Sequence, residues 1–327
     1  MAYTGSGQLI EATDFNGLAS TNVYISSTNV GGNVAWVWGT GYGNTGYGQS
    51  TTLLASVSSA AIITATQWAG LIYTTNKALA HQNAATIGGG PLGANINVVS
   101  GAIITYFSNV ASAVTLVNNL PGKLGYYAQG TLSTGADFSS TITAAGSTTA
   151  LSYSTTRTVT FASGDAARYF FNAGGRITHA ITTTNLNGTA RSQDFAQMFA
   201  SNIASSYIQA NLSVGKTGTG GGNVTNSTNL GYYSLTTSFQ TLANVQPSGQ
   251  AYSYSNDWAR VQVKTSAPSG SAGDNGAVIT FQLDAASPAQ VNSNFNDAVS
   301  VTVNSRIDIT PPETTYLANV WGVIGIS

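Results

Sequence analysis

The sequence predicts an α+β protein, with short helices on a Gly-rich frame in its N-terminal part and a mainly antiparallel β-sheet with one packed helix in its C-terminal part. Three observations lead to this fold class. Apolar residues recur at helical spacing before residue 130, and they alternate with polar residues after residue 150. Between these regions, residues 131–154 are rich in Ser, Thr, Gly and Ala. We therefore expect two domains, a mixed helical and loop assembly domain at 1–150 and an antiparallel β-rich α+β domain at 151–327.

Two segments of the first half have the apolar spacing of helices. Residues 64–82 place apolar side chains on one face, and Thr64 with Gln67 fits a capping box. Residues 101–119 show a similar stripe, but their β-branched side chains leave a pair of strands open as an alternative. The Pro-Gly pair at 121–122 ends this segment in either case.

The second half is dominated by segments that alternate apolar and polar residues, as half-buried strands do. One helix, residues 192–210, is expected to interrupt them, and residues 217–229 read as a long flexible loop or hairpin tip. The strand-like segments are "TRTVTFAS", "RITHAIT", "ARVQVKT", "GAVITFQLD" and "AVSVTVNSRIDI".

The chain carries very little charge. Charged residues make up 6% of it, against about 25% in a typical soluble domain, and the formal net charge is −1. A surface of hydroxyls and amides gives copies little reason to repel each other, which suits a large permanent assembly. We expect no nucleic-acid partner, because no basic patch is present, and no membrane insertion, because no long apolar run is present. The first residues lack the pattern of a secretory signal, so we expect assembly in the cytoplasm.

Residues that carry chemistry are sparse. Cysteine is absent, which excludes disulfides and thiolate sites, and His81 and His179 are the two histidines. The segment "VGKTGTGGG" is no phosphate loop, because Ala210 stands where the first glycine belongs. A pair of carboxylates acting on a glycoside stays open, since spacing alone does not exclude it. We predict a protein that is not an enzyme, with no catalytic residues, no metal site and no cofactor.

The Gly/Tyr-rich segment "WVWGTGYGNTGYGQ", residues 36–49, is a candidate contact site. A loop of this composition is ordered only where its tyrosines pack on something, and a partner surface is one such place. We expect contacts between subunits from residues 39–49 and from 217–229. The alternative is a stacking platform for a glycan on the host surface. The candidate interface or glycan contacts are Trp36, Trp38, Tyr42 and Tyr47.

A second segment, "DAARYFFNAGGRITH" at 165–179, concentrates charged and aromatic residues. We expect Ser163 or Asp165 to cap a short helix and Asp165 to pair with Arg168 three residues later. The Gly-Gly pair then ends the helix, the aromatic residues anchor it on the sheet, and a strand follows. This structural signature comprises Asp165, Arg168, Tyr169, Phe170, Phe171, Gly174, Gly175 and Arg176.

The segment "TVTFASGDAARYFFNAGGRI" resembles one that recurs in virion structural proteins of tailed bacteriophages, mostly tail or structural proteins of marine and T4-like phages. The segments "YGQ", "ITATQW", "HQ" and "FNDAVSVTVNSRIDITPP" resemble the same proteins in the same order. The match is patchy over most of the chain. The resemblance implies a phage virion protein; it implies neither a position in the particle nor any catalytic residue.

We therefore expect a non-enzymatic structural subunit of the virion, in the tail, the tail tip or a fibre. Such a subunit forms permanent symmetric interfaces with its own copies and with other virion proteins. One alternative is a fibre module that binds a receptor or host surface glycan through exposed aromatic residues. Another is a virion-attached hydrolase.

Overall fold

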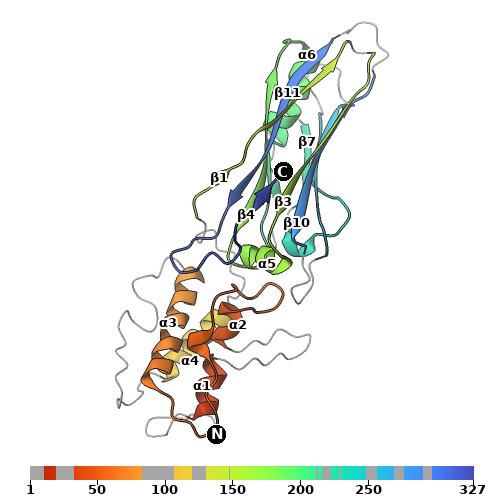
Figure 1. The fold of residues 1–327 in the computed structure, drawn as a ribbon. Helices are drawn as coiled ribbons and strands as arrows, with labels where there is room; N and C mark the ends of the chain where they lie inside the picture. Colours follow the sequence, from red (N-terminus) through yellow and green to blue (C-terminus); the bar gives the residue numbers. More distant parts are fainter. Residues whose placement is uncertain are drawn as a thin grey trace.

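The computed structural model describes residues 11–19, 33–82, 107–119, 130–146, 148–210, 213–215, 222–227, 230–247, 256–268, 276–289 and 297–327. Most of the helices lie at one end of an elongated molecule, and the strands lie at the other end together with the remaining helices (Figure 1). The predicted α+β class is confirmed, with the helices mainly in the first half and antiparallel strands in the second.

The N-terminal end is a small helical unit, which we call the helical base. Its capping box is formed as predicted: the Thr64 N–H donates to Gln67 Oε1 at 2.8 Å, and the Gln67 N–H donates to Thr64 Oγ1 at 3.3 Å. Residues 107–119 are helical, so a strand pair is wrong there, and residues 101–106 lie outside the described part. The base contains α1 (Ala12–Ala19), α2 (Val34–Trp38), the 3-10 turn η1 (Thr52–Leu54), α3 (Ala65–Gln82) and α4 (Phe107–Asn119).

The C-terminal part is a β-sandwich, where the sequence led us to expect one sheet. Two antiparallel six-stranded sheets face each other (Figure 1). One has the order β1-β11-β4-β5-β6 with β2 also on β11, and the other has the order β12-β3-β10-β9-β8-β7. The strands are β1 (Ser133–Thr134), β2 (Phe138–Ala144), β3 (Leu151–Thr160), β4 (Arg176–Asn185), β5 (Ser205–Ile208), β6 (Ser213–Gly215), β7 (Gly222–Asn226), β8 (Gln240–Pro247), β9 (Trp258–Thr265), β10 (Val278–Ser287), β11 (Val299–Thr310) and β12 (Gly325–Ile326).

The sheet begins earlier than the boundary we placed near residue 150. Strand β2 pairs with β11 from Phe138 opposite Ser305 to Ala144 opposite Val299. Its burial is slight, with Ile142 and Ala144 as its buried residues, so its Ser/Thr-rich sequence shows little alternation. The 1–150 domain therefore includes two strands that belong to the sandwich.

The helix predicted at 192–210 is shorter than expected. It comprises α6 (Ala190–Gln197) and a π-helical turn at Met198–Asn202, after which β5 pairs with β4. The helical spacing of this segment predicted five inward residues. Phe195, Met198, Phe199 and Ile203 are buried as expected, whereas Tyr207 lies half-buried on β5. Residues 205–208 form a strand instead of continuing the helix, because pairing with β4 brings Ile208 into the core opposite Ile177.

The Gly-rich stretch at 217–229 is not simply a loop. Residues 222–226 form β7, which pairs with β8. Residues 217–221 and 228–229 lie outside the described part of the chain, so the expected subunit contact there stays a prediction.

The core of the sandwich follows the alternation seen in the sequence. On β9, Ala259, Val261 and Val263 are buried, and on β10, Ile279 and Phe281 are buried. Helix α5 (Gly164–Asn172) closes the end of the sandwich that faces the base, between β3 and β4 (Figure 1). That junction carries the site described below.

Candidate functional site

Helix α5 begins and ends through local chemistry. The Ser163 hydroxyl caps it by accepting a hydrogen bond from the Ala166 N–H at 3.0 Å. At its other end the Gly174 N–H donates to the Phe171 carbonyl and the Gly175 N–H donates to the Phe170 carbonyl. This is the Schellman pattern, and it needs the positive φ of 99° that Gly174 adopts. The capped helix, the Gly-Gly stop and the following strand β4 are thus confirmed.

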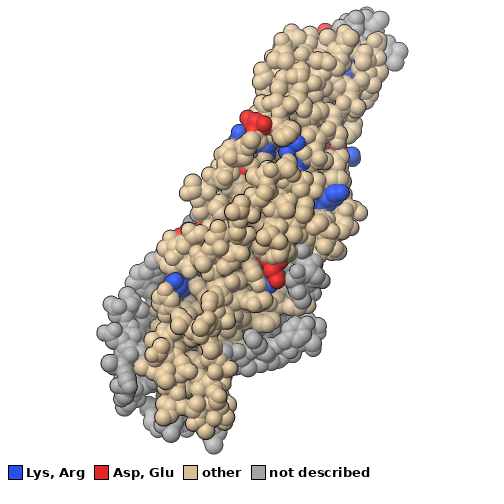
Figure 2. Space-filling view, in the orientation of Figure 1, with Lys and Arg blue, Asp and Glu red and all other residues tan. Residues whose placement is uncertain are grey.

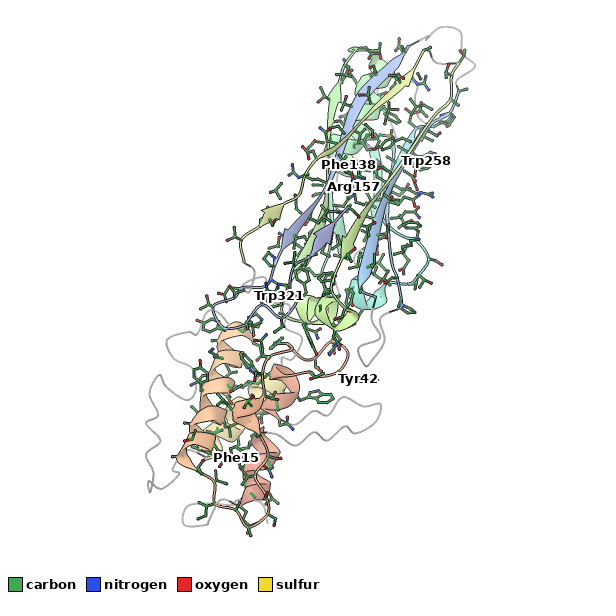
Figure 3. All side chains as sticks on the ribbon, viewed as in Figure 1. Phe15, Tyr42, Phe138, Arg157, Trp258 and Trp321 are labelled. Atoms are coloured by element: carbon green, nitrogen blue, oxygen red, sulfur yellow. The ribbon has the colours of Figure 1, made fainter. Side chains whose placement is uncertain are left out.

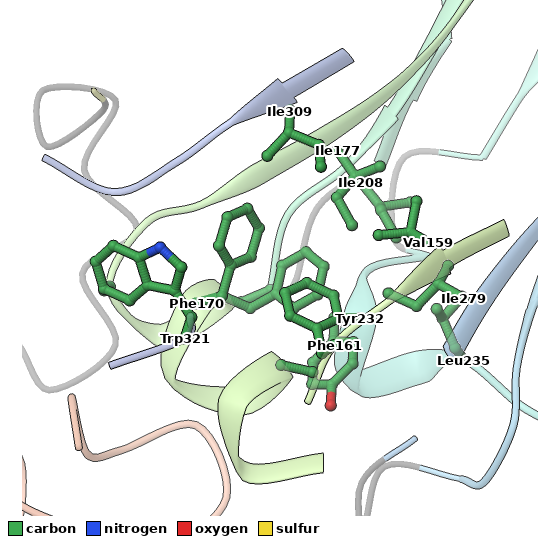
Figure 4. Close-up of a cluster of buried hydrophobic side chains, with 14 of the residues drawn as sticks. Val159, Phe161, Phe170, Ile177, Ile208, Tyr232, Leu235, Ile279, Ile309 and Trp321 are labelled. Carbon is green, nitrogen blue, oxygen red and sulfur yellow. The ribbon is translucent and has the colours of Figure 1, made fainter. Parts of the chain in front are cut away.

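The aromatic residues of the signature anchor α5 in the core. Phe170 and Phe171 are fully buried, and Phe171 stacks on Tyr232 with ring centroids 4.3 Å apart. Phe170 lies 6.3 Å from the ring of Trp321 near the C-terminus (Figure 4). A Cβ at Gly175 would lie 2.4 Å from the Phe170 ring, so this ring occupies the space that any other residue needs.

Arg168 is the central polar residue of the junction. Its Nε donates to Asp165 Oδ1 at 3.1 Å, which confirms the predicted pair. The Arg168 side chain is 1% exposed and the Asp165 side chain 42%, so the arginine is the buried partner. A buried guanidinium needs partners for its remaining N–H groups, because desolvation without hydrogen bonds is costly.

Those partners are backbone carbonyls of the Gly/Tyr loop, residues 39–49. Arg168 Nη2 donates to the Thr40 carbonyl at 2.7 Å, and Nη1 donates to the Thr45 carbonyl at 2.8 Å. Nη1 also lies 3.4 Å from the Gly43 carbonyl. A helix of the sandwich therefore holds a loop of the helical base.

Asn172 and Tyr233 complete the same arrangement, and we call Arg168, Asn172 and Tyr233 the clamp. Asn172 Nδ2 lies 3.0 Å from the Thr45 and Gly46 carbonyls. The Tyr233 hydroxyl lies 2.9 Å from the Gly43 carbonyl and 2.5 Å from Asn172 Oδ1. Burial raises the pKa of Tyr233 above its usual value, so it stays a hydroxyl. The sequence placed Asn172 in the segment that resembles phage proteins and offered Tyr233 as a sugar-stacking residue, but it did not indicate that either residue binds the loop.

Two further contacts join the loop to the sandwich. Gly48 lies against the Tyr169 ring, which a Cβ at Gly48 would approach to 2.4 Å. The Gln49 side chain pairs with the backbone of Ala318, with its Nε2 donating to the carbonyl at 3.0 Å and its Oε1 accepting from the N–H at 2.8 Å. The C-terminal segment that holds Ala318 and Trp321 therefore contacts both parts of the molecule (Figure 3).

The four candidate contact aromatics do not share one exposed face. Trp38 is 6% exposed and Tyr47 is fully buried, with the Tyr47 hydroxyl accepting from Gln82 Nε2 at 3.1 Å. These two side chains are core residues, so for them a glycan platform is wrong. Trp36 and Tyr42 are half-buried and remain accessible. The loop itself packs on α5 of its own chain, so contact with another subunit stays a prediction for its outer side.

Arg176 stays within the sandwich. Its guanidinium lies 5.1 Å from the centre of the Tyr207 ring, and Nη2 lies 3.5 Å from Thr310 Oγ1. The Arg176 residue is half-buried. The guanidinium groups of Arg168 and Arg176 therefore both have contacts within their own chain.

Strand β4 brings His179 within 2.7 Å of Ser305 Oγ on β11. Both residues are at most 1% exposed, and the His179 ring stacks on Phe281 at 5.7 Å. Burial, and then the nearby charge of Arg157, lowers the pKa of His179 to about 3. This enclosed neutral imidazole acts as a hydrogen-bond partner within the core, as its place on the apolar face of the strand predicted.

A buried polar cluster lies near α6. Arg191 is fully buried and donates to the Gly146 carbonyl at 2.7 Å and to Ser287 Oγ at 2.8 Å. Burial raises the pKa of Asp257 to about 6, while Ser287 and Arg191 oppose that shift. Burial likewise raises the pKa of Asp194 to about 6. Asp257 is fully buried and Asp194 is 3% exposed, so these carboxyl groups lie away from solvent.

One depression opens on the surface of the helical base. It has a volume of about 610 Å³ and lies between α2, the Gly/Tyr loop and the residues around η1. The described residues that line it are Ala35, Trp36, Thr40, Gly41, Thr51, Thr52, Leu54, Ala55 and Ser56.

The comparisons with known proteins found no match to a family model, a curated protein or a solved structure. Among the described residues, no cluster of three or more His, Asp or Glu side chains could hold a metal ion. No helix in the described ranges is long and apolar enough to cross a membrane.

Proposed function

We propose that this chain is a non-enzymatic structural subunit of a tailed-phage virion, placed in the tail, the tail tip or a fibre. The observation that carries the proposal is the clamp, through which α5 of the sandwich holds the Gly/Tyr loop of the base. A subunit that contacts neighbours on both sides in a particle needs its two parts to keep a fixed orientation relative to each other. Buried, charge-assisted hydrogen bonds provide that rigidity.

The surface supports the same proposal. In the face shown in Figure 2, charged side chains are few and scattered over a neutral surface. Several large apolar side chains are exposed, among them Val323 at 91%, Ile62 at 87% and Phe138 at 56%. Neutral surfaces with exposed apolar side chains favour permanent contacts with other copies, because little charge must be desolvated when the contacts form.

Two measurements test the proposal. In purified virions, peptide mass spectrometry and a cryo-EM map are expected to show the chain in several symmetric copies. Sedimentation of the purified chain over a hundredfold range of concentration is expected to show a stable oligomer. A monodisperse monomer that is absent from purified particles would contradict the proposal.

A further inference from the structure

We propose that the depression beside Trp36 binds a neutral oligosaccharide. The inference goes beyond the structural role proposed above and does not rest on it. The depression's volume of about 610 Å³ lies within the range of about 300–1,000 Å³ that is usual for small-molecule sites.

The chemistry of the described lining residues indicates the class of ligand. They include one large aromatic side chain, Trp36, and the others are small or hydroxyl-bearing residues with Leu54. None of these nine described residues is charged. An indole offers a flat apolar surface on which the C–H face of a pyranose ring stacks, and a site without charge has no preference for charged sugars.

Among the described lining residues, three side-chain hydroxyls are available to bind a ligand. Within the described part of the chain, no hydrogen bond engages the side-chain hydroxyls of Thr40, Thr51 or Ser56. Each hydroxyl donates one hydrogen bond and accepts others, as sugar hydroxyls do. The Thr52 hydroxyl, by contrast, already lies 3.0 Å from Ser50 Oγ.

The walls of the depression are held in place before any ligand arrives. The Trp36 backbone N–H donates to the Asn33 side chain at 3.0 Å, which caps α2. The Thr40 carbonyl is held by Arg168, and Gly39 approaches the Thr51 methyl so closely that a Cβ at Gly39 would lie 2.6 Å from it. Preorganised walls reduce the entropy lost when a ligand binds.

The test uses the full chain in its native oligomer on an array of gluco-, galacto- and manno-oligosaccharides of two to six residues, with hexuronate oligomers as the charged comparison. We expect binding to neutral oligosaccharides and none to the hexuronates. Calorimetry with the best binder then gives the affinity of each variant in solution. No binding to any neutral oligosaccharide would overturn the proposal.

The variants locate the site. Trp36→Ala is expected to weaken binding at least about tenfold, and Thr51→Val, which keeps the side-chain shape, about threefold to tenfold. The matched control is Trp258→Ala, because Trp258 is a half-buried tryptophan on β9 of the sandwich. Trp36 also packs against the core, so Trp36→Phe and Thr40→Val provide the test if Trp36→Ala does not fold.

Two results would place the ligand or the function elsewhere. Unchanged affinity in Trp36→Phe, Thr40→Val and Thr51→Val, with loss in Trp258→Ala, would move the site to the sandwich and overturn the proposal. A Trp36→Ala chain that keeps its sugar affinity but no longer oligomerises would make the depression a subunit contact instead.

Discussion

Arg168 Nη2 donates a hydrogen bond of 2.7 Å to the carbonyl of Thr40, a residue 128 positions earlier in the chain. The arginine belongs to the sandwich and the carbonyl to the helical base. The contact satisfies a buried cation and a loop carbonyl at the same time, so neither group is left without a partner. The two parts of the molecule are therefore coupled by direct hydrogen bonds from α5 to backbone carbonyls of the loop.

Replacing Arg168 by alanine is expected to lower the free energy of unfolding by roughly 2–4 kcal/mol. The reason is that the Thr40 carbonyl loses its Arg168 donor inside the junction, and the Thr45 carbonyl keeps Asn172 but loses Arg168. Urea unfolding followed by circular dichroism measures the effect. The matched control is Arg176→Ala, which removes a half-buried arginine and is expected to cost about 1 kcal/mol or less. Equal losses in both variants would contradict the role of the clamp.

Removing the Tyr233 hydroxyl tests the clamp without removing charge. Tyr233→Phe is expected to lower the free energy of unfolding by about 1 kcal/mol, because the hydroxyl partner of Gly43 and Asn172 is lost. The exposed Tyr73 gives the control, since Tyr73→Phe removes a hydroxyl that is accessible to water. The same urea titration compares them, and a Tyr73→Phe effect as large as that of Tyr233→Phe would speak against this reading.

Replacing two glycines by alanine is expected to change the free energy of unfolding in opposite directions. Gly175→Ala is expected to lower it by roughly 1–3 kcal/mol, because its Cβ would lie 2.4 Å from the Phe170 ring. Gly17 lies in α1, and a Cβ there meets nothing within 4 Å. Gly17→Ala is therefore expected to stabilise by about 0.5–1 kcal/mol, the helix propensity difference. Thermal melts of both variants show whether the signs differ as expected.

The stability of the protein is expected to depend on two buried histidines below neutral pH. Burial lowers the pKa of His81 to about 4, and burial with the charge of Arg157 lowers that of His179 to about 3. Between pH 6.5 and 4 these histidines take up protons in the unfolded chain but stay neutral in the folded protein. Their contribution therefore lowers the free energy of unfolding as the pH falls. Asp194 and Asp257 act oppositely, since their raised pKa values favour the folded state as the pH drops from about 6 to 4.

His81→Gln isolates one of these contributions. The variant is expected to show a smaller loss of unfolding free energy between pH 6.5 and 4 than the unmodified chain, with the difference on the order of a few kcal/mol. Urea titrations at several pH values give the slopes. The parallel variant Asp257→Asn is expected to change the slope in the other direction, and identical slopes for all three chains would refute the assignment.

Local sequence patterns predicted the elements that depend on neighbouring residues. The Ser163 cap, the Asp165–Arg168 pair and the Gly-Gly helix end each involve residues at most five positions apart. The capping box of Thr64 and Gln67 is of the same kind. Patterns at this range are visible in the sequence because the contact partners are close along it.

The sequence-based predictions were wrong where a segment's conformation depends on partners far away in the sequence. Residues 205–208 continue an apolar helical stripe, yet they pair with β4 as a strand. Residues 138–144 read as a Ser/Thr-rich connection, yet they pair with β11. Among the candidate aromatics, Tyr47 belongs to a segment with the composition of a surface loop, but its side chain lies in the core beside Gln82.

The sequence by itself determined the α+β class, the strand alternation and the capped helix with its glycine stop, because periodicity, capping and turn chemistry act over a few residues. Only the tertiary structure decided that two sheets form a sandwich, and that Arg168 binds Thr40 and Thr45 rather than another subunit. The physical reason is that a carbonyl has no sequence signature: any residue offers one, and the fold alone selects which carbonyls a buried guanidinium meets.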